Sequence, residues 1–425
     1  MPGIATEVPS ADVLVVGAGP AGSSAAYWLA RAGFDVVVLE KSAFPREKVC
    51  GDGLTPRGVK ALLDMGIDTS PAAGWVRHKG LRVAGGGQVV EVDWPKLEHW
   101  PDYSLVRRRS ELDALLAGHA QAAGAVLHTG VTVTDPLLDE AGRVVGVRTL
   151  TGPDKEPGAW RAQLVVSAEG LSGRLAKSLG LVRREDRPLG IAVRRYVRTP
   201  HADDAYLDIS FDLSADGPTA AAMPGYGWVF GMGDGTANVG FGLLDTHRGD
   251  GSDHREVLRQ WLATFPAEDQ LDEEHAVTPL RGSGLPMALH RGPAYSRGLL
   301  LAGDSAGTVN PFNGEGISYA METGRMAAET AVDALVRPEG PRRETALRRY
   351  PDRLRAEYGR HHRLGMGFLA LLSRPGLVRF AAAHGLKRPP LVVAALRLMG
   401  NLTDGWDGDR VDRAIAMLTR VAPAV

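Results

Sequence analysis

Cysteine is almost absent from this chain of 425 residues, which contains Cys50 alone. One thiol cannot form a disulfide within the chain, and it cannot supply a zinc or iron–sulfur site that needs several cysteines. Long apolar runs are also lacking, since no segment reaches the roughly 18 residues of a membrane span. The opening MPGIATEVPS has no basic and apolar signal segment. These absences predict a cytoplasmic protein that is soluble or peripheral on the inner face of the cell membrane.

An excess of either charge is missing too. Lys and Arg number 49 against 50 Asp and Glu, which gives a net charge of -1. No global field therefore attracts nucleic acid, and we expect no nucleic-acid partner. Neither Cys50 nor the pair His361 and His362 predicts a metal site. What the chain has is length and 44% hydrophobic residues, enough to bury a large core in two or three units.

The order of predicted elements indicates an α/β fold with a discontinuous first domain. We expect a Rossmann-type dinucleotide-binding domain of residues 10–75, 105–185 and 285–340. Strand-like runs predict a mainly antiparallel, α+β substrate domain of residues 76–104 and 186–284. Residues 341–425 are predicted to form a helical C-terminal region.

A glycine fingerprint follows the first predicted strand. The segment DVLVVGAGPAGSSAAYWLARAGFDVVVLE at 12–40 predicts a strand, a turn, a helix and a second strand. Gly17, Gly19 and Gly22 allow the turn, close approach of a pyrophosphate and helix packing, while Glu40 can accept hydrogen bonds from a ribose. The acid at Glu40 favours FAD or NAD over NADP.

A second signature distinguishes FAD from NAD. Gly303 and Asp304 follow an apolar strand, and NPFNGEGI at 310–317 leads into a predicted helix. An extended flavin needs an acid for its ribityl hydroxyls and a helix start that stabilises negative charge on the reduced ring. Asp304 and the glycines beside Ile317 offer both, so the predicted cofactor is FAD.

These motifs together resemble the geranylgeranyl reductase family of para-hydroxybenzoate hydroxylase-like flavoproteins. GAGPAG with Glu40, KVCGDG, the R-x-x-L-D sequence from Arg109, AEGLSGR and GDSAGTVNPFNGEGI occur in the family's order over residues 10–330. KVCGDGLTPR, YGWVF and NVGFG are most similar to the actinobacterial members that act on the polyprenyl tail of menaquinone. Two departures are Glu169, where relatives usually have Asp, and Gly231, where they usually have Pro.

The resemblance implies a set of flavin contacts. They are Gly17, Gly19, Ala21, Gly22, Glu40, Cys50, Gly51, Gly53, Arg109, Asp304, Gly316 and Ile317. Arg109 also has a chemical reason, because a guanidinium can bind diphosphate or ribityl oxygens with two parallel hydrogen bonds. The alternative is a solvated arginine beside Arg107 and Arg108.

Reduction of an isolated alkene needs a proton for one carbon and a hydride for the other. Tyr226, Trp228 and Phe230 alternate along a predicted strand and share one face, where they could line a prenyl pocket and stabilise positive charge. Cys50 is the candidate catalytic residue, as a proton donor or a group that gates the flavin. The alternatives are core packing for the three rings and a small buried filler for Cys50.

The predicted function is therefore an FAD-dependent reductase of an isoprenoid double bond in a polyprenyl lipid, menaquinone or a geranylgeranyl compound. Alternatives are a flavin-dependent monooxygenase or halogenase and a non-catalytic prenyl-lipid carrier. YGWVFG lacks the second Trp and the Pro of the WxWxIP halogenase motif. We expect an external electron donor, a nicotinamide or a ferredoxin-like protein. The apolar, Arg-interrupted segments near the C-terminus could contact a membrane surface or pack on the catalytic domain.

Overall fold

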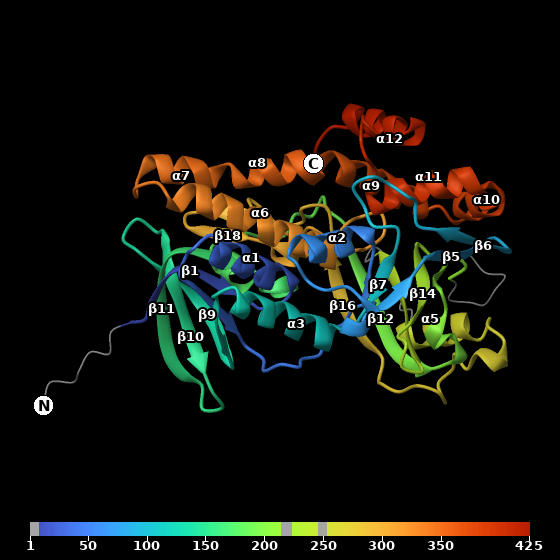
Figure 1. The fold of residues 1–425 in the computed structure, drawn as a ribbon, viewed down its shortest axis with the longest axis horizontal. Helices are drawn as coiled ribbons and strands as arrows, with labels where there is room; N and C mark the ends of the chain where they lie inside the picture. Colours follow the sequence, from blue (N-terminus) through green and yellow to red (C-terminus); the bar gives the residue numbers. More distant parts are fainter. Residues whose placement is uncertain (1–7, 214–222, 245–252) are drawn as a thin grey trace, which may run out of the picture.

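The computed structural model describes residues 8–213, 223–244 and 253–425. Figure 1 shows two lobes side by side, each built on a β-sheet, with the last helices of the chain running along the top of both. The point where the two lobes meet positions the candidate site.

The first lobe contains a sheet with a parallel centre in the order β18-β11-β1-β2-β8. β17 extends it beyond β18, and β10 and β9 continue antiparallel from the outer half of β11. Val13, Leu14 and Val15 are fully buried, as expected for a parallel strand covered on both faces. The strands are β1 (Ser10–Val16), β2 (Val36–Glu40), β8 (Val126–Thr129), β9 (Val131–Leu138), β10 (Val144–Thr151), β11 (Glu156–Ser167), β17 (Tyr295–Ser296) and β18 (Leu299–Leu301).

Helices α1 (Pro20–Arg31), α3 (Arg109–Ala122) and α6 (Ile317–Leu335) pack on this sheet. α1 and α6 approach closely because a Cβ at Gly324 would lie 2.2 Å from the Ala21 carbonyl oxygen. The Ser24 hydroxyl donates to the Met321 carbonyl at 2.6 Å across the same contact. Two helices far apart in sequence thus begin beside each other at the carboxyl ends of the strands.

The second lobe is a mainly antiparallel sheet in the order β16-β12-β15-β14-β13-β5-β6. Its one parallel pair joins β13 to β5, which brings residues 80–93 beside strands that come more than 100 residues later. Helix α5 (His254–Leu262) closes its core through Trp261 and Leu258. The strands are β5 (Gly80–Gly85), β6 (Gln88–Asp93), β12 (Leu189–Arg198), β13 (Tyr206–Ser210), β14 (Gly225–Gly231), β15 (Thr236–Leu244) and β16 (Arg281–Pro286).

A small sheet in the order β3-β7-β4 lies between the lobes, next to α2. The chain ends in a series of helices, and a π-helix (Arg355–Gly359) joins α8 to α9. No helix in the described ranges is both long enough and apolar enough to span a bilayer. The remaining elements are β3 (Gly53–Leu54), β4 (Val76–His78), β7 (Ser104–Val106), α2 (Pro56–Asp64), α4 (Arg174–Ser178), α7 (Pro341–Arg348), α8 (Tyr350–Leu354), α9 (Arg360–Leu372), α10 (Pro375–Gly385), α11 (Pro389–Gly400) and α12 (Arg410–Val421).

The predicted architecture, a Rossmann-type α/β lobe with an antiparallel second sheet and a helical C-terminal region, is confirmed. The domain boundaries stay a prediction. In detail, residues 126–138 form two strands and not one, because Gly130 adopts a left-handed φ of 73° between β8 and β9. The helix predicted after NPFNGEGI begins at Ile317, the last residue of that motif.

Four histidines of the described residues are buried, and His78 allows the clearest test of their effect on stability. Its side chain is fully buried, neither ring nitrogen has a hydrogen-bond partner among the described residues, and burial lowers its pKa from 6.5 to about 4. Below pH 6.5, His78 is therefore protonated in the unfolded chain but stays neutral in the folded chain until the pH approaches 4. Protonation of His78 in the unfolded chain lowers the free energy of unfolding by about 1.4 kcal/mol for each pH unit below 6.5.

We expect His78→Leu to lose less stability than the parent between pH 7 and pH 5, measured by urea unfolding at each pH. The same substitution at His384, an exposed residue of α10, is the control and should leave the pH dependence unchanged. Equal pH dependence in the parent and His78→Leu would contradict the argument.

Candidate active site

A cavity of about 850 Å³ lies where the two lobes and the C-terminal helices meet. One end is lined by the glycine turn after β1, the middle by Cys50 and the aromatic side chains of β14, and the far end by apolar residues of α9, α10 and α11. Of the predicted site residues, Gly22 alone is not in its wall. The others line it: Gly17, Gly19, Ala21, Glu40, Cys50, Gly51, Gly53, Arg109, Tyr226, Trp228, Phe230, Asp304, Gly316 and Ile317.

The glycine turn forms a cradle that side chains would block. Gly17 has a left-handed φ of 97°, and a Cβ there would lie 2.5 Å from the Ala168 carbonyl oxygen. A Cβ at Gly22 would lie 1.8 Å from the Gly17 carbonyl oxygen, which explains its place behind the wall. No side chain caps the start of α1 at Gly19, so its free N–H groups and partial positive charge face the cavity. This geometry fits a pyrophosphate.

Glu40 ends β2 and shares its carboxylate with the turn. Its oxygens accept hydrogen bonds from the Ala18 N–H at 2.9 Å and the Ser42 N–H at 3.0 Å. A guanidinium nitrogen of Arg46 lies 3.7 Å away. Two backbone bonds fix the orientation of the carboxylate, and its remaining acceptor capacity fits the ribose hydroxyls expected for it.

Arg109 differs from the expectation that it binds the cofactor with two parallel hydrogen bonds. Its Nε and Nη2 instead donate to the two oxygens of Asp113, at 2.8 and 3.0 Å, one turn further along α3. Asp113 is fully buried, and its carboxylate also forms an ion pair with a guanidinium nitrogen of Arg46 at 3.0 Å. Burial works to lower the pKa of Arg109, but Asp113 and Cys50 raise it overall. Asp113 thus holds two guanidinium groups, and their N–H groups that it does not engage are left for the cavity.

Asp304 and the start of α6 form the opposite wall. The Asp304 carboxyl accepts no hydrogen bond within the described residues. Its position in the wall removes it from water, which raises its pKa. The carboxyl is half-buried and open to the cavity, where ribityl hydroxyls would supply the hydrogen-bond donors that it lacks. Gly316 begins α6 without a side-chain cap, leaving N–H groups for an anion there. The residues present therefore fit an extended flavin.

A hydrogen-bond network fixes the Cys50 loop. Asn238 of β15 donates to the Cys50 carbonyl and to the Asp52 carboxylate, both at 2.8 Å. The same carboxylate accepts from the Tyr196 hydroxyl of β12 and, through its other oxygen, from the Arg109 N–H at 3.1 Å. Asp52 has a left-handed φ of 65°. Burial raises the pKa of the Cys50 thiol, with Arg109 partly opposing the shift, which keeps the thiol neutral.

The aromatic residues of β14 lie against this loop. Trp228 donates from Nε1 to the Asn238 side-chain oxygen at 3.0 Å, so one amide holds both the tryptophan and the Cys50 carbonyl. The ring centroids of Tyr226 and Trp228 are 6.1 Å apart and those of Trp228 and Phe230 are 6.2 Å apart. The three rings line the cavity as a continuous tilted row.

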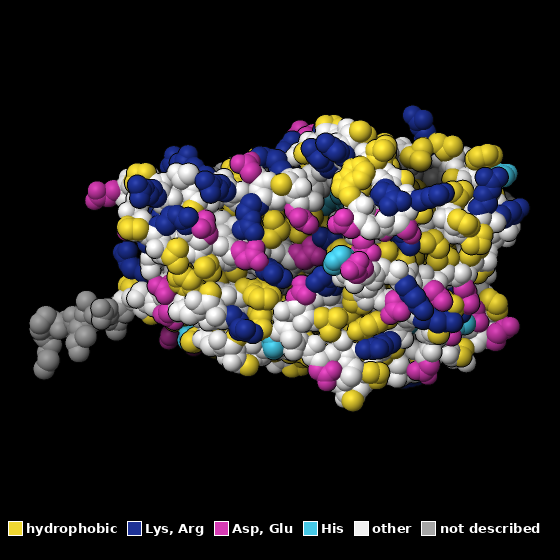
Figure 2. All heavy atoms as spheres, turned by 45° about the horizontal axis from the view of Figure 1, so that its top comes forward, with side chains coloured by type: hydrophobic (Ala, Val, Ile, Leu, Met, Phe, Trp, Pro, Cys, Tyr) yellow, Lys and Arg dark blue, Asp and Glu magenta, His cyan; other side chains and the backbone are white. Residues whose placement is uncertain are grey.

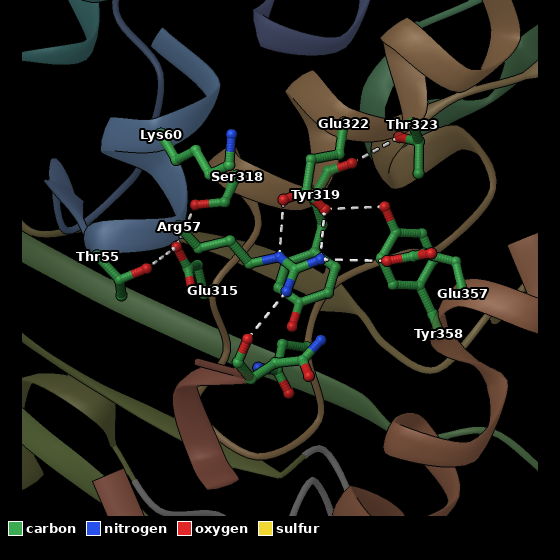
Figure 3. Close-up of polar contacts among 12 residues, drawn as sticks. Thr55, Arg57, Lys60, Glu315, Ser318, Tyr319, Glu322, Thr323, Glu357 and Tyr358 are labelled. Carbon is green, nitrogen blue, oxygen red and sulfur yellow. Dashed lines mark hydrogen bonds and ion pairs between the residues drawn. The ribbon is translucent and has the colours of Figure 1, made fainter. Parts of the chain in front are cut away.

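Glu315 is a further acid in the wall, next to the start of α6. Its Oε1 accepts from the Thr55 hydroxyl at 2.7 Å and from the Ser318 hydroxyl, while its buried Oε2 has no partner among the described residues. Figure 3 shows both donors directed at this carboxyl. Burial raises the pKa of Glu315. Because Oε1 already accepts two hydrogen bonds, the proton of the neutral acid belongs on Oε2.

Behind Glu315, Arg57 joins four parts of the chain (Figure 3). The guanidinium pairs with both oxygens of Glu322 on α6, at 2.7 and 2.9 Å. It also donates to the Asn401 carbonyl after α11 at 3.0 Å, and the Tyr358 hydroxyl of the π-helix donates to Glu322. The C-terminal helices are thereby attached to the wall that carries Glu315.

The two departures from the family pattern differ in position, because Glu169 lies in the wall of the cavity and Gly231 does not. Glu169 accepts from the Ser167 hydroxyl at 2.9 Å and the Leu175 N–H at 3.0 Å, which caps the start of α4. Gly231 packs against the loop after β12, where a Cβ would lie 2.5 Å from the Ala202 carbonyl oxygen, and it is not among the residues that line the cavity.

Sequence reasoning missed several residues of the site. Asp52 and Asp113 lie inside quoted motifs, and Glu315 lies inside NPFNGEGI, so an acid in a glycine-rich motif was the available signal. Asn238 opens the quoted NVGFG motif, whereas Tyr196 lies outside every quoted motif, and the role of both depends on how β12 and β15 pack against the Cys50 loop.

Comparisons with known proteins agree with this geometry. A family described as "FAD binding domain" matches residues 10–207. The chain is 36% identical to menaquinone reductase of Mycolicibacterium smegmatis, covering 95% of this chain and 94% of that protein. It is 35% identical to digeranylgeranylglycerophospholipid reductase 1 of Methanopyrus kandleri, covering 82% and 86%.

Among solved structures, a geranylgeranyl bacteriochlorophyll reductase-like protein of Thermoplasma acidophilum has the same fold. Its TM-score is 0.78 at 22% identity, covering 97% of this chain and 100% of that one. The fold, the cradle and the extent of these matches lead to one conclusion: the chain belongs to the geranylgeranyl reductase family of FAD-dependent oxidoreductases.

Proposed function

We propose that this enzyme saturates an isoprenoid double bond in a polyprenyl lipid, with the side chain of menaquinone as its substrate. The cavity is the observation behind this proposal. It connects the FAD cradle to a long apolar end, which suits an apolar prenyl chain. Leu372, Leu386 and Leu396 contribute to that end. The similarity to proteins named menaquinone reductase over nearly the whole chain supports the choice of lipid.

The residues around the middle of the cavity have distinct proposed tasks. FAD, when bound and reduced by the external electron donor, would supply the hydride. Trp228 and its neighbouring rings exclude water, orient the prenyl chain and stabilise positive charge that develops on it. Glu315 holds the proton for the other carbon on Oε2, and Cys50 remains the second candidate for that proton.

Trp228 allows a direct test of the ring's task. We expect Trp228→Leu to lower turnover about 30-fold, the value of a desolvated cation–π contact of about 2 kcal/mol, with little change in FAD content. Trp228→Phe is the matched control, because it also loses the hydrogen bond to Asn238 but keeps a ring. Equal losses in both variants would assign the effect to that hydrogen bond, and loss of FAD in parallel with turnover would contradict the pocket role.

The far end of the cavity supports entry of the lipid from a membrane surface. Leu377 and Leu391 line the cavity and are also 40% and 52% exposed, while Phe380 beside them is 61% exposed. Exposed basic residues, among them Lys387 and Arg388, flank them, and Figure 2 shows hydrophobic and basic side chains together over these helices at the upper right. Apolar and cationic groups in one surface favour anionic membranes.

This surface lies on the apolar, Arg-interrupted segments for which membrane contact is expected from the sequence, and that contact stays a proposal. In the Arg-rich stretch 342–363, Arg348, Arg353 and Arg355 form ion pairs with acids of the protein. Co-sedimentation with anionic vesicles tests the surface, and failure of Phe380→Ser to weaken it would contradict the proposal. The electron donor, a nicotinamide or a ferredoxin-like protein, stays a prediction.

The decisive experiment is anaerobic reduction of the purified holoenzyme by light, followed by addition of menaquinone with an unsaturated side chain. Reoxidation of the flavin with a gain of two mass units per reduced bond supports the proposal. Persistence of reduced flavin with unchanged lipid, followed by oxygen incorporation into an aromatic compound in air, would replace it with a monooxygenase.

A further inference from the structure

A second cavity, of about 880 Å³, opens beside the first and has a very different wall. Leu244 and Leu369 line both cavities, so a single apolar partition separates them. The rest of the second wall is strongly cationic, with Glu185 as its one acid among the described residues. We call it the basic pocket and define it by Lys177, Arg183, Arg184, Arg187 and Arg291.

Arg187 is buried in this pocket without an adequate partner. Its side chain is 3% exposed, yet Nη1 meets only the Met366 sulfur at 3.4 Å and an oxygen of Asp186 at 3.6 Å. Asp186 itself is bound by both arms of Arg184, at 2.8 and 3.0 Å. The Nε of Arg187 is buried and unpartnered among the described residues. A buried cation left in this state is costly unless an anion completes it.

Arg291 repeats the pattern from the other side of the pocket. It is 4% exposed and donates only to backbone carbonyls, of Ser305 at 3.3 Å and Leu171 at 3.4 Å. Its Nε is also buried and unpartnered. Two buried guanidinium groups without an adequate charged partner thus lie in the wall of a space large enough for a ligand.

Burial and the neighbouring positive charges destabilise the protonated form of each guanidinium. The pKa of Arg187 is lowered by burial and then by Arg184, and that of Arg291 is lowered by burial and then by Arg183. A bound anion would reverse these effects, since an opposite charge nearby favours the protonated guanidinium. Guanidinium groups bind phosphate oxygens through two parallel hydrogen bonds, which single carboxylates and halides use less fully.

We propose that the basic pocket binds a phosphate group, with Arg187 and Arg291 as buried contacts and Lys177, Arg183 and Arg184 at its rim. The phosphate comes from one of two sources, a nicotinamide dinucleotide that delivers electrons or the glycerophosphate head of a lipid. A molecule bound in the basic pocket would lie next to the reaction cavity, separated from it by Leu244 and Leu369. The site is independent of which double bond is reduced, and even of whether prenyl reduction occurs.

The test is calorimetric titration of the full-length, FAD-loaded protein with pyrophosphate, NADP⁺ and glycerol 3-phosphate. We expect pyrophosphate to bind, and Arg187→Gln to weaken it by about tenfold or more, the value of a charge-assisted hydrogen bond. Arg184 is 44% exposed, so Arg184→Gln is a second variant whose folding should not be affected. It should weaken pyrophosphate binding by a smaller factor than Arg187→Gln. Arg148→Gln on β10, an exposed arginine outside the pocket, is the control and should bind as the parent does.

The other two probes identify the source. NADP⁺ that competes with pyrophosphate and depends on Arg187 supports a dinucleotide, whereas the same behaviour of glycerol 3-phosphate supports a lipid head. Absence of pyrophosphate binding, or binding that is unchanged in both Arg187→Gln and Arg184→Gln, overturns the proposal. Because no turnover is measured, failure of this site and failure of prenyl reduction are distinguished.

Discussion

Replacing Glu315 by glutamine is expected to lower double-bond reduction about 100-fold or more while FAD content stays at the parent level. Glutamine keeps an oxygen to accept from Thr55 and Ser318, so the wall should hold its shape. It cannot hold an acidic proton at the position of Oε2. Since burial raises the pKa of Glu315, its carboxyl keeps its proton to a higher pH than an exposed glutamate and loses it as the pH rises further. Parent turnover should therefore fall on the alkaline side, and the variant should lack that limb.

Three comparisons sharpen this experiment. Glu357→Gln changes an acid that is 55% exposed and lies on the far side of Arg57, and it should leave turnover unchanged. Infrared spectroscopy should show a protonated carboxyl band that disappears in Glu315→Gln, a readout independent of activity. Parent-like turnover in Glu315→Gln, combined with its loss in Cys50→Ala, would assign the proton to the thiol and sink the role of Glu315.

Replacing Asp113 by alanine is expected to destabilise the protein by about 3–5 kcal/mol and to release FAD. The carboxylate is fully buried and pairs with Arg109 and Arg46, so its removal leaves two cations without compensation beside the glycine turn. The free energy of unfolding in urea and the flavin absorbance of the purified protein measure the two effects.

The same helix provides the matched control. Glu111 is 53% exposed and forms an ion pair with Arg107 one turn along, so Glu111→Ala should change stability by no more than about 0.5 kcal/mol. An Asp113→Ala protein that keeps both its stability and its flavin would show that solvent or other groups compensate Arg109 and Arg46.

The parts of this protein that were predictable from sequence are local ones. A glycine turn between a strand and a helix needs only about 30 residues to be recognised, and Gly17, Gly19 and Glu40 meet as expected at the carboxyl end of β1 and β2. Asp304 was predictable for the same reason, because an acid directly after a buried strand lies at the edge of the sheet where ligands bind.

The contacts that fix the Cys50 loop could not be predicted in this way. Asp52, Tyr196 and Asn238 are brought together by the pairing of β12 with β15 and by the packing of one lobe on the other. Nothing in their local sequence specifies that packing. Arg109 shows a related limit, since its charge was recognised but its preference for Asp113 over a ligand follows from a helical turn that buries both.

The Arg57 cluster has a consequence for how the enzyme is made. Arg57 precedes its partner Glu322 by 265 residues and Asn401 by 344 residues. At a translation rate of about 5–20 residues per second, roughly 20–70 s separate the synthesis of Arg57 from that of Asn401. During that interval the wall beside Glu315 is unfinished and the last helices that line the cavity do not exist. The nascent chain can thus form the glycine cradle early, but it completes the compartment for FAD and lipid only near the end of its synthesis.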